Sequence, residues 1–288
     1  IFMKKIITAA LIIAFGINSN AQGNDKDFRF GLKIEPSFNW LSPDKAEKFE
    51  SGGIKMGFGI GAMTDFKLGG NVWLSTGVAV DFNGAKLNYL DNTISDTSGF
   101  YPGYFHYSSG QSSGIVSVDD ANSALLDTAS TTFSDYSFIK LQNRTIRAQY
   151  VNIPLFIKMK TNEIGYLTYF GQFGLNTSIK TKARSTDVGE IISATNLASS
   201  DLDDLDIEKE VSLFKMAGSI GGGFEYNLSE STSLSVAVIF DYGFTSLTKK
   251  TSDHVIAIQN GQTVTAFEAY SDQKNKANAV RLTVGILF

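Results

Sequence analysis

Eight segments of the chain alternate between apolar and polar residues with a period of two. One of them is the stretch NAVRLTVGILF, residues 278–288, in which every second residue from Val280 to Phe288 is apolar. Successive side chains of a β-strand point to opposite faces, so this alternation predicts strands with one apolar and one polar face. The predicted strands cover residues 27–41, 54–68, 72–82, 150–160, 166–179, 214–228, 233–244 and 278–288.

The charges of these segments are confined to one face. The apolar faces carry no Asp, Glu, Lys or Arg, whereas the opposite faces carry residues of both signs. A water-soluble barrel shows the reverse arrangement, with apolar side chains inside and charges outside. We therefore expect a charge network in the lumen of a barrel whose outer surface faces lipid. The residues expected in this network are Arg29, Lys33, Glu35, Lys55, Asp65, Asp81, Lys158, Glu225, Asp241 and Arg281.

A lipid-facing sheet must be closed. Hydrocarbon offers no hydrogen-bond partners, so strands can cross it only in a ring in which every backbone group is paired. Short turns follow the second, fourth and sixth predicted strands, and long connections follow the others. These features predict an all-β fold: an eight-stranded antiparallel transmembrane up-and-down β-barrel with short periplasmic turns and long extracellular loops, in the outer membrane of a bacterium. The last strand is expected to pair with the first.

The N-terminal segment has the features of a secretory signal peptide. Lys4 and Lys5 precede an apolar run over residues 6–17, and the small-residue site Ser19-Asn20-Ala21 follows. We expect a signal peptide in residues 1–21, with Ile1 and Phe2 as a start artefact, and the outer-membrane barrel domain in residues 22–288. The chain has no cysteine, which excludes disulfides and thiolate chemistry. A net charge of -4 excludes a nucleic-acid partner.

The stretch YVNIPLFIK carries a family resemblance. Its Tyr150, Ile153, Pro154, Leu155 and Lys158 resemble the YxxIPLxxK signature of the PorT-like outer-membrane β-barrel family of Bacteroidetes. The segment GFEYNL at residues 223–228 extends the resemblance, which implies a barrel fold and, through the founding member of the family, an association with type IX secretion. The long second loop, about residues 86–147, departs from the compact members. A proline inside a strand forfeits a ladder hydrogen bond, so we expect a bulge at Pro154.

Few residues outside the strands suggest chemistry. The interior of an eight-stranded barrel is filled by side chains, which favours a salt-bridged plug over a pore. His106, in the run His-Tyr-Ser, and the pair Asp253-His254 are candidates for a hydrolase, but both lie in predicted loops without a rigid scaffold. The acidic run at residues 201–210 could bind calcium. A solvated rim with a helical turn around Leu202 and Leu205 is the favoured interpretation.

These patterns lead to one functional expectation with two alternatives. We expect a non-enzymatic outer-membrane protein, structural or partner-binding through its extracellular loops, without catalytic, cofactor or metal sites. The alternative is an accessory subunit of a type IX secretion or other envelope complex, and a barrel-mouth hydrolase is less favoured. Outer-membrane lipid is the expected partner, and other outer-membrane or secretion-complex proteins remain open as partners. The loop at residues 100–114, rich in Tyr, Phe, Ser and Gly, suits adaptable surface contacts and mobile loops equally.

Overall fold

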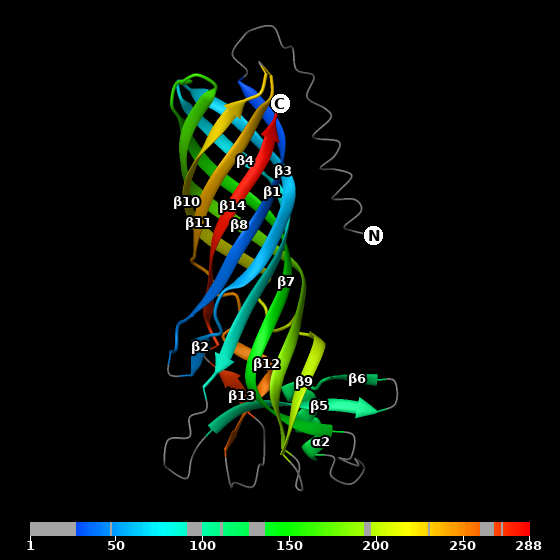
Figure 1. Ribbon diagram of the computed structural model, residues 1–288. Helices are drawn as coiled ribbons and strands as arrows, with labels where there is room; N and C mark the ends of the chain where they lie inside the picture. Colours follow the sequence, from blue (N-terminus) through cyan, green and yellow to red (C-terminus); the bar gives the residue numbers. More distant parts are fainter. Residues whose placement is uncertain are drawn as a thin grey trace.

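The computed structural model shows an elongated molecule with a barrel at one end and a folded head at the other (Figure 1). It describes residues 27–46, 48–90, 100–109, 112–126, 136–192, 197–229, 231–259, 268–271 and 273–288. The expected signal peptide at residues 1–21 lies outside them. The elements are β1 Phe28–Pro43, β2 Phe49–Ser51, β3 Lys55–Gly69, β4 Val72–Tyr89, β5 Phe100–Ser109, β6 Ser112–Ile115, α2 Val118–Leu126, β7 Tyr136–Lys160, β8 Leu167–Ile192, β9 Leu197–Asp206, β10 Phe214–Asn227, β11 Ser233–Gly243, β12 Thr251–Gln259, β13 Glu268–Ser271 and β14 Asn275–Leu287.

Eight of these strands close a ring, which confirms the predicted fold. The ring runs β1-β3-β4-β7-β8-β10-β11-β14 and returns to β1, and every neighbouring pair is antiparallel. The last strand pairs with the first along its length, for example at Gly31↔Leu287 and Ser37↔Arg281. Closure removes both sheet edges, so every strand of the ring finds a partner on each side. The remaining strands lie in the head.

The ring strands have an apolar outer face. Leu32, Ile60, Leu155, Phe173 and Val238 are all more than a third exposed and form part of a wide apolar band. Their sequence neighbours face the lumen and are buried. An outer face without ionised groups is what hydrocarbon requires, because a lysine or arginine at mid-depth costs about 2–4 kcal/mol. Among the described residues, no helix is long and apolar enough to cross a membrane.

The extracellular connections fold into a head. The outer parts of β4, β7 and β8 continue beyond the barrel, and β5, β9 and β12 extend the same sheet. The buried apolar residues of this head are Leu41, Phe49, Ala85, Leu87, Tyr89, Tyr104, Ile139, Leu141, Ile146, Ala148, Tyr150, Ala183, Leu205, Ile207, Val211, Leu247, Val255 and Tyr270. The expectation of a loop over residues 86–147 is therefore wrong at both ends, where β4 and β7 extend into it.

The wall of the molecule reverses its polarity between the barrel and the head. On β7, Val151 and Ile153 face outward in the barrel, and Asn152 and Lys158 face inward. Beyond Tyr150 the buried inner residues of β7 are apolar except for Arg144, and the outer face becomes polar. The barrel thus resembles a protein in lipid and the head a protein in water, although the same strands run through both.

Pro154 sits in β7 without the expected bulge. The register shifts of β7 against β8 lie at Leu141/Asn143 and Gln149/Tyr150, while Pro154 pairs in register with Asn176. On the other side, the pairing with β4 stops at Thr76↔Leu155 and resumes in the same register at Ala79↔Asn152. The Thr76 Oγ1 hydroxyl donates a hydrogen bond to the Pro154 carbonyl at 2.7 Å. The prediction of a bulge is wrong because an interrupted ladder is sufficient to accommodate the missing N–H.

Candidate functional site

The lumen near the periplasmic turns holds a cluster of three cations and two carboxylates. Arg29 Nη1 lies 2.6 Å from Glu225 Oε2, and Lys158 Nζ lies 2.7 Å from Asp65 Oδ2. Lys160 joins both carboxylates, at 2.9 Å from Glu225 and 3.6 Å from Asp65. The ammonium groups of the two lysines also lie over aromatic rings. Lys158 Nζ is 4.5 Å from the centre of the Phe170 ring, and Lys160 Nζ is 4.3 Å from that of Trp73. Each buried charge thus has a partner of the opposite sign.

A second cluster lies deeper in the barrel. Arg281 binds Asp241 through Nε at 2.6 Å and Nη2 at 3.1 Å, and its Nη1 reaches Glu35 at 3.2 Å. Lys33 Nζ lies 2.8 Å from Glu35 Oε2. The Thr283 hydroxyl donates to Glu35 at 2.8 Å. The strands β1, β11 and β14 are neighbours, which is why residues more than 200 positions apart in the sequence meet here.

Two of the ten expected lumenal residues stand apart from both clusters. Asp81 is buried against Gly59 and its Oδ1 atom has no hydrogen-bond partner among the described residues. Lys55 is half-buried at the outer end of β3 and forms no ion pair with any residue that the structure describes. The other eight residues all belong to one of the two clusters. Lys160 also belongs to the first cluster, although it is not among the ten.

Side chains fill the lumen between and above these clusters. Phe156, Phe170, Ala237 and Ile239 form a small apolar layer inside the barrel. A cavity of about 30 Å³ beside this layer and another of about 20 Å³ below the head have room for a single water molecule each. A wider vestibule of about 550 Å³ opens at the periplasmic turns. The interior has the dimensions of a packed core.

The core of the head contains a buried ion pair. Arg144 on β7 and Asp187 on β8 are 2% and 0% exposed, and two hydrogen bonds join them, from Nε at 2.9 Å and from Nη2 at 2.7 Å. Burial alone would lower the pKa of Arg144, but the Asp187 carboxylate raises it above its usual value, so the guanidinium stays charged. The Tyr104 ring lies 5.9 Å away. Tyr104 itself is fully buried, so β5 is neither an adaptable contact surface nor a mobile loop at this point.

Sequence reasoning missed this pair, although a signal was present. Ile146, Ala148 and Tyr150 form an alternating apolar series towards the N-terminal end of β7, and Arg144 is the one charge on this face between residues 144 and 150. A single charge on an otherwise apolar strand face indicates a buried partner, because an unpaired charge there would be costly. Asp187 occupies the matching position in the register of β8.

Glu210 anchors the start of β12 in the head. Its Oε1 atom accepts hydrogen bonds from the Ser252 hydroxyl at 2.6 Å and from the backbone N–H groups of Asp253 and His254 at 2.9 Å each. The His254 Nδ1 atom lies 2.9 Å from the same oxygen. His106, on β5, makes no side-chain hydrogen bond or ion pair with a described residue. The structure therefore pairs His254 with a carboxylate, whereas His106 has no such partner among the described residues.

We expect the head to lose stability in acid through Glu210. Burial alone would raise the pKa of this carboxyl, but hydrogen bonds from His254 and Ser252 and the charge of Arg144 hold it below its ordinary value of 4.5. A carboxyl with a lowered pKa in the folded state stabilises that state above its unfolded pKa, and the contribution is lost as the pH falls through the folded pKa. Hydrogen exchange of β12 at pH values between 7 and 3 measures this loss.

The matched variants are Glu210→Gln and Asp201→Asn, the second of which removes an exposed carboxylate of the head. Glu210→Gln is expected to expose β12 to exchange already at pH 7 and to flatten its pH dependence below 4.5, whereas Asp201→Asn leaves both unchanged. Identical pH profiles for Glu210→Gln and the unaltered protein would contradict the assignment.

The acidic run at residues 201–210 adopts another structure than expected. Residues up to Asp206 belong to β9, which pairs with β8, so the helical turn expected around Leu202 and Leu205 is wrong. Leu205 is buried in the head core, whereas Asp204 and Asp206 point outward. Within the ranges that the structure describes, no group of three or more histidine or acidic side chains is arranged to hold a metal ion.

Comparison with known proteins agrees with this geometry. Residues 20–249 match a family described as outer membrane protein beta-barrel domain. The chain belongs to this family. The match ends before β14, the strand that closes the ring in the structure. The protein lies in the bacterial outer membrane, where its apolar band contacts lipid. No curated protein sequence matches the chain.

Solved structures of similar architecture have very different sequences. The neisserial surface protein A (NspA) is 7% identical with a TM-score of 0.36, covering 90% of this chain and 95% of that one. The outer membrane protein OprG from Pseudomonas aeruginosa is 11% identical with a TM-score of 0.35, covering 91% and 95%. The outer membrane protease OmpT from Escherichia coli is 6% identical with a TM-score of 0.36, covering 91% and 96%. The family assignment rests on the sequence match and the closed ring.

Proposed function

We propose that this protein is a non-enzymatic outer-membrane barrel that binds a partner through its extracellular head. The observation that carries the proposal is the head itself, which has its own apolar core and the buried Arg144–Asp187 pair. Connections that only join strands have no need of such a core, whereas a binding surface must be held in one shape. In this proposal the lumenal charge network is a structural plug that holds the eight strands together.

The geometry around His254 favours a structural role over hydrolysis. In a serine hydrolase the nucleophilic hydroxyl donates to the imidazole, which a carboxylate orients from the other side. Here the Ser252 hydroxyl donates to Glu210, and its Oγ atom accepts the backbone N–H groups of His254 and Val255. The three side chains therefore tie down the start of β12, and the serine is not positioned for attack.

A role as an accessory subunit of a type IX secretion or other envelope complex is the second candidate. It is favoured by the PorT-like signature in β7, of which Tyr150 and Lys158 face inward and Leu155 faces lipid. We also infer that residues 1–21 are removed as a signal peptide and that residues 22–288 form the mature barrel domain. A partner in this second role would be another protein of the outer membrane or of the secretion complex.

Affinity capture from native envelopes tests the proposed function. The protein is tagged and expressed as the unaltered chain, as Arg144→Met, and as the double variant R144M/D187L, which replaces both buried charges by apolar side chains. We expect to recover a partner protein with the unaltered chain and with the double variant. With Arg144→Met we expect its recovery to fall about tenfold or more, because the partner binds only the folded head.

Two results would contradict the proposal: recovery of no protein above an untagged control, or equal recovery with Arg144→Met. A deletion strain separates the two candidates. Loss of secreted proteins together with capture of a large outer-membrane protein would favour the secretion role. Normal secretion together with capture of a surface partner would favour the first candidate.

A further inference from the structure

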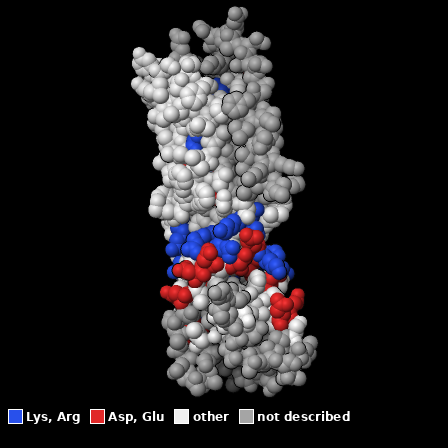
Figure 2. Space-filling view, turned by 90° about the vertical axis from the view of Figure 1, so that its right-hand side faces the viewer, with Lys and Arg blue, Asp and Glu red and all other residues white. Residues whose placement is uncertain are grey.

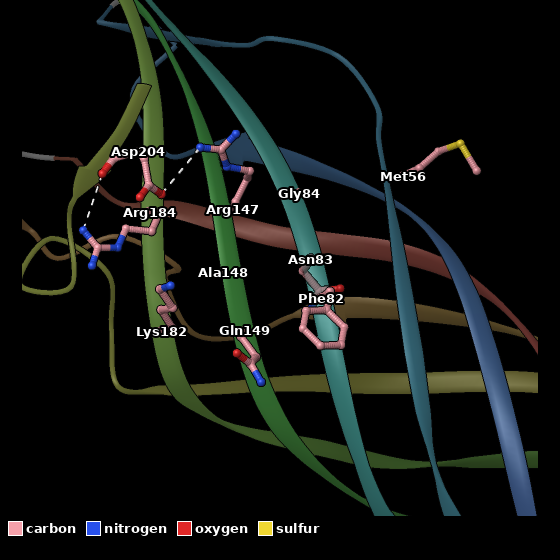
Figure 3. Close-up of a pocket in the computed structure, with 10 residues that line it drawn as sticks. All are labelled: Met56, Phe82, Asn83, Gly84, Arg147, Ala148, Gln149, Lys182, Arg184 and Asp204. Atoms are coloured by element: carbon pink, nitrogen blue, oxygen red, sulfur yellow. Dashed lines mark hydrogen bonds and ion pairs between the residues drawn. The ribbon is translucent and has the colours of Figure 1, made fainter. Parts of the chain in front are cut away.

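A groove crosses the outer wall of the molecule where the barrel meets the head. It has a volume of about 430 Å³ and runs over the neighbouring strands β3, β4, β7 and β8 to β9 (Figure 3). Gly84, which has no side chain, forms part of its lining and leaves room there. The groove opens sideways, away from the lumen and from both charge clusters described above.

One side of the groove is cationic. Arg147 on β7 and Lys182 and Arg184 on β8 line it together with a single carboxylate, Asp204 on β9. Asp204 occupies this position with a backbone φ of 54°, the one positive φ among the non-glycine residues that the structure describes. A second carboxylate, Asp206, lies outside the lining but 3.6 Å from Arg184 Nη1. Three cations against these two carboxylates leave an excess of one positive charge.

The cations retain hydrogen-bonding capacity. Arg147 Nη2 lies 4.0 Å from Asp204 Oδ1, at the limit of an ion pair, and both side chains are exposed. Arg184 Nη1 donates to the Asp204 carbonyl at 3.4 Å and lies 3.6 Å from the partly exposed Asp206 carboxylate, whereas its Nε atom has no hydrogen-bond partner among the described residues. The exposed Lys182 makes no hydrogen bond or ion pair with any described residue. Figure 3 shows these side chains over the same stretch of β7 and β8.

The other side of the groove is apolar and belongs to the lipid-facing band. Met56 on β3 and Phe82 on β4 line it, and they are 71% and 50% exposed. The groove therefore spans the level at which the wall changes from apolar to polar. Figure 2 shows a band of Lys, Arg, Asp and Glu side chains at this level, beside a barrel surface almost free of charge. In a membrane, this is the level of the outer-leaflet headgroups.

We propose that this groove binds a phosphorylated lipid of the outer leaflet, with its phosphate at Arg147, Lys182 and Arg184 and an acyl chain against Met56 and Phe82. Guanidinium and ammonium groups donate charge-assisted hydrogen bonds to phosphate oxygens. A lipid uses both halves of the groove at once. Its phosphate lies at the depth of the cations, and the acyl chain joined to it begins at the depth of the apolar side chains. A free phosphate uses only the cationic half. The site is independent of the head surface proposed for partner binding.

Titration with a defined lipid tests this site. The full protein in detergent micelles is titrated with a diphosphorylated saccharolipid, with the same lipid after removal of its phosphates, and with inorganic phosphate, and bound lipid is counted by native mass spectrometry. We expect saturable binding of the phosphorylated lipid. Lys182→Gln is expected to weaken it about fivefold, and R147Q/K182Q about 30-fold, from roughly 1 kcal/mol per surface cation.

Lys250→Gln is the matched control, because it removes an exposed lysine of the head outside the groove. Unchanged affinity in this variant, with weakened affinity in Lys182→Gln, supports the site. Equal binding of the phosphate-free lipid would overturn the proposal, as would unchanged affinity in R147Q/K182Q. Inorganic phosphate binding as tightly as the lipid would overturn the assignment of a lipid.

Discussion

Replacing Arg144 with methionine is expected to destabilise the head by about 3–5 kcal/mol, because Asp187 then remains as an uncompensated charge in an apolar core. The barrel is expected to stay folded, since its own charge clusters and its lipid-facing band are untouched. Hydrogen exchange measures the effect: protection of the head core, for example at Ile146, falls, whereas protection of Lys158 in the same strand persists.

The double variant R144M/D187L is the control for this prediction. It removes both charges and fills their space with apolar atoms, so protection of the head is expected to return to that of the unaltered protein or to exceed it. If the double variant were as unstable as the single one, the cost would come from lost packing rather than from an unpaired charge. Loss of the barrel in Arg144→Met would show that head and barrel unfold as one unit.

An arginine on the outer face of the barrel is expected to have the second large effect. Leu155 is 53% exposed and is the middle residue of the lipid-facing series on β7, from Val151 to Met159. Leu155→Arg is expected to lower the free energy of unfolding by about 2–4 kcal/mol, because the guanidinium must enter hydrocarbon. Reversible denaturant unfolding from phospholipid vesicles measures this change.

Met159→Arg provides the depth control on the same strand and face. Met159 lies next to the periplasmic turn, where the guanidinium can reach water, and its substitution is expected to cost at most about 1 kcal/mol. Equal costs at the two positions would place this face outside the hydrocarbon and would contradict the orientation of the barrel.

The barrel was predictable because its strands follow a single rule. From Val151 to Met159 every second residue is apolar, and two of the four residues between them, Asn152 and Lys158, are polar. Membrane insertion imposes this rule on every strand, since each must present apolar side chains to lipid. Ring closure followed from the same rule, because β14 would otherwise leave unpaired backbone groups in hydrocarbon.

The head was not predictable because the apolar residues move from the outer face to the inner face within a single strand. From Met159 back to Val151, the apolar residues of β7 that alternate along the strand occupy odd positions. From Tyr150 back to Ile146 they occupy even positions. In the sequence this change of phase looks like the end of a strand. The structure shows one uninterrupted strand whose surroundings change from lipid to water. Pairs such as Arg144–Asp187 and Glu210–His254 depend on which distant segments lie next to each other. The alternation within one segment does not give this information.

The candidate sites likewise include residues that the sequence could predict and residues that it could not. Eight of the ten expected lumenal residues meet in two clusters because they share the inward face of the ring. The first cluster joins strands across the lumen, and the second lies on the neighbouring strands β1, β14 and β11. Lys55 does not join them, because it is the first residue of β3 and lies at the end of the strand away from Asp65. The groove at Lys182 had no sequence signal, since its residues come from β3, β4, β7, β8 and β9.

The continuity of β4, β7 and β8 has a mechanical consequence. In the described part of the chain these three strands run from the barrel into the head without a break, so the barrel anchored in the bilayer fixes the tilt and rotation of the head. From Tyr150 to Tyr136, β7 extends for about 45 Å along its length at roughly 3.3 Å per residue. A molecule captured at the tip would therefore stand at a set height above the cell surface, and a pulling force on it would pass directly into the barrel wall.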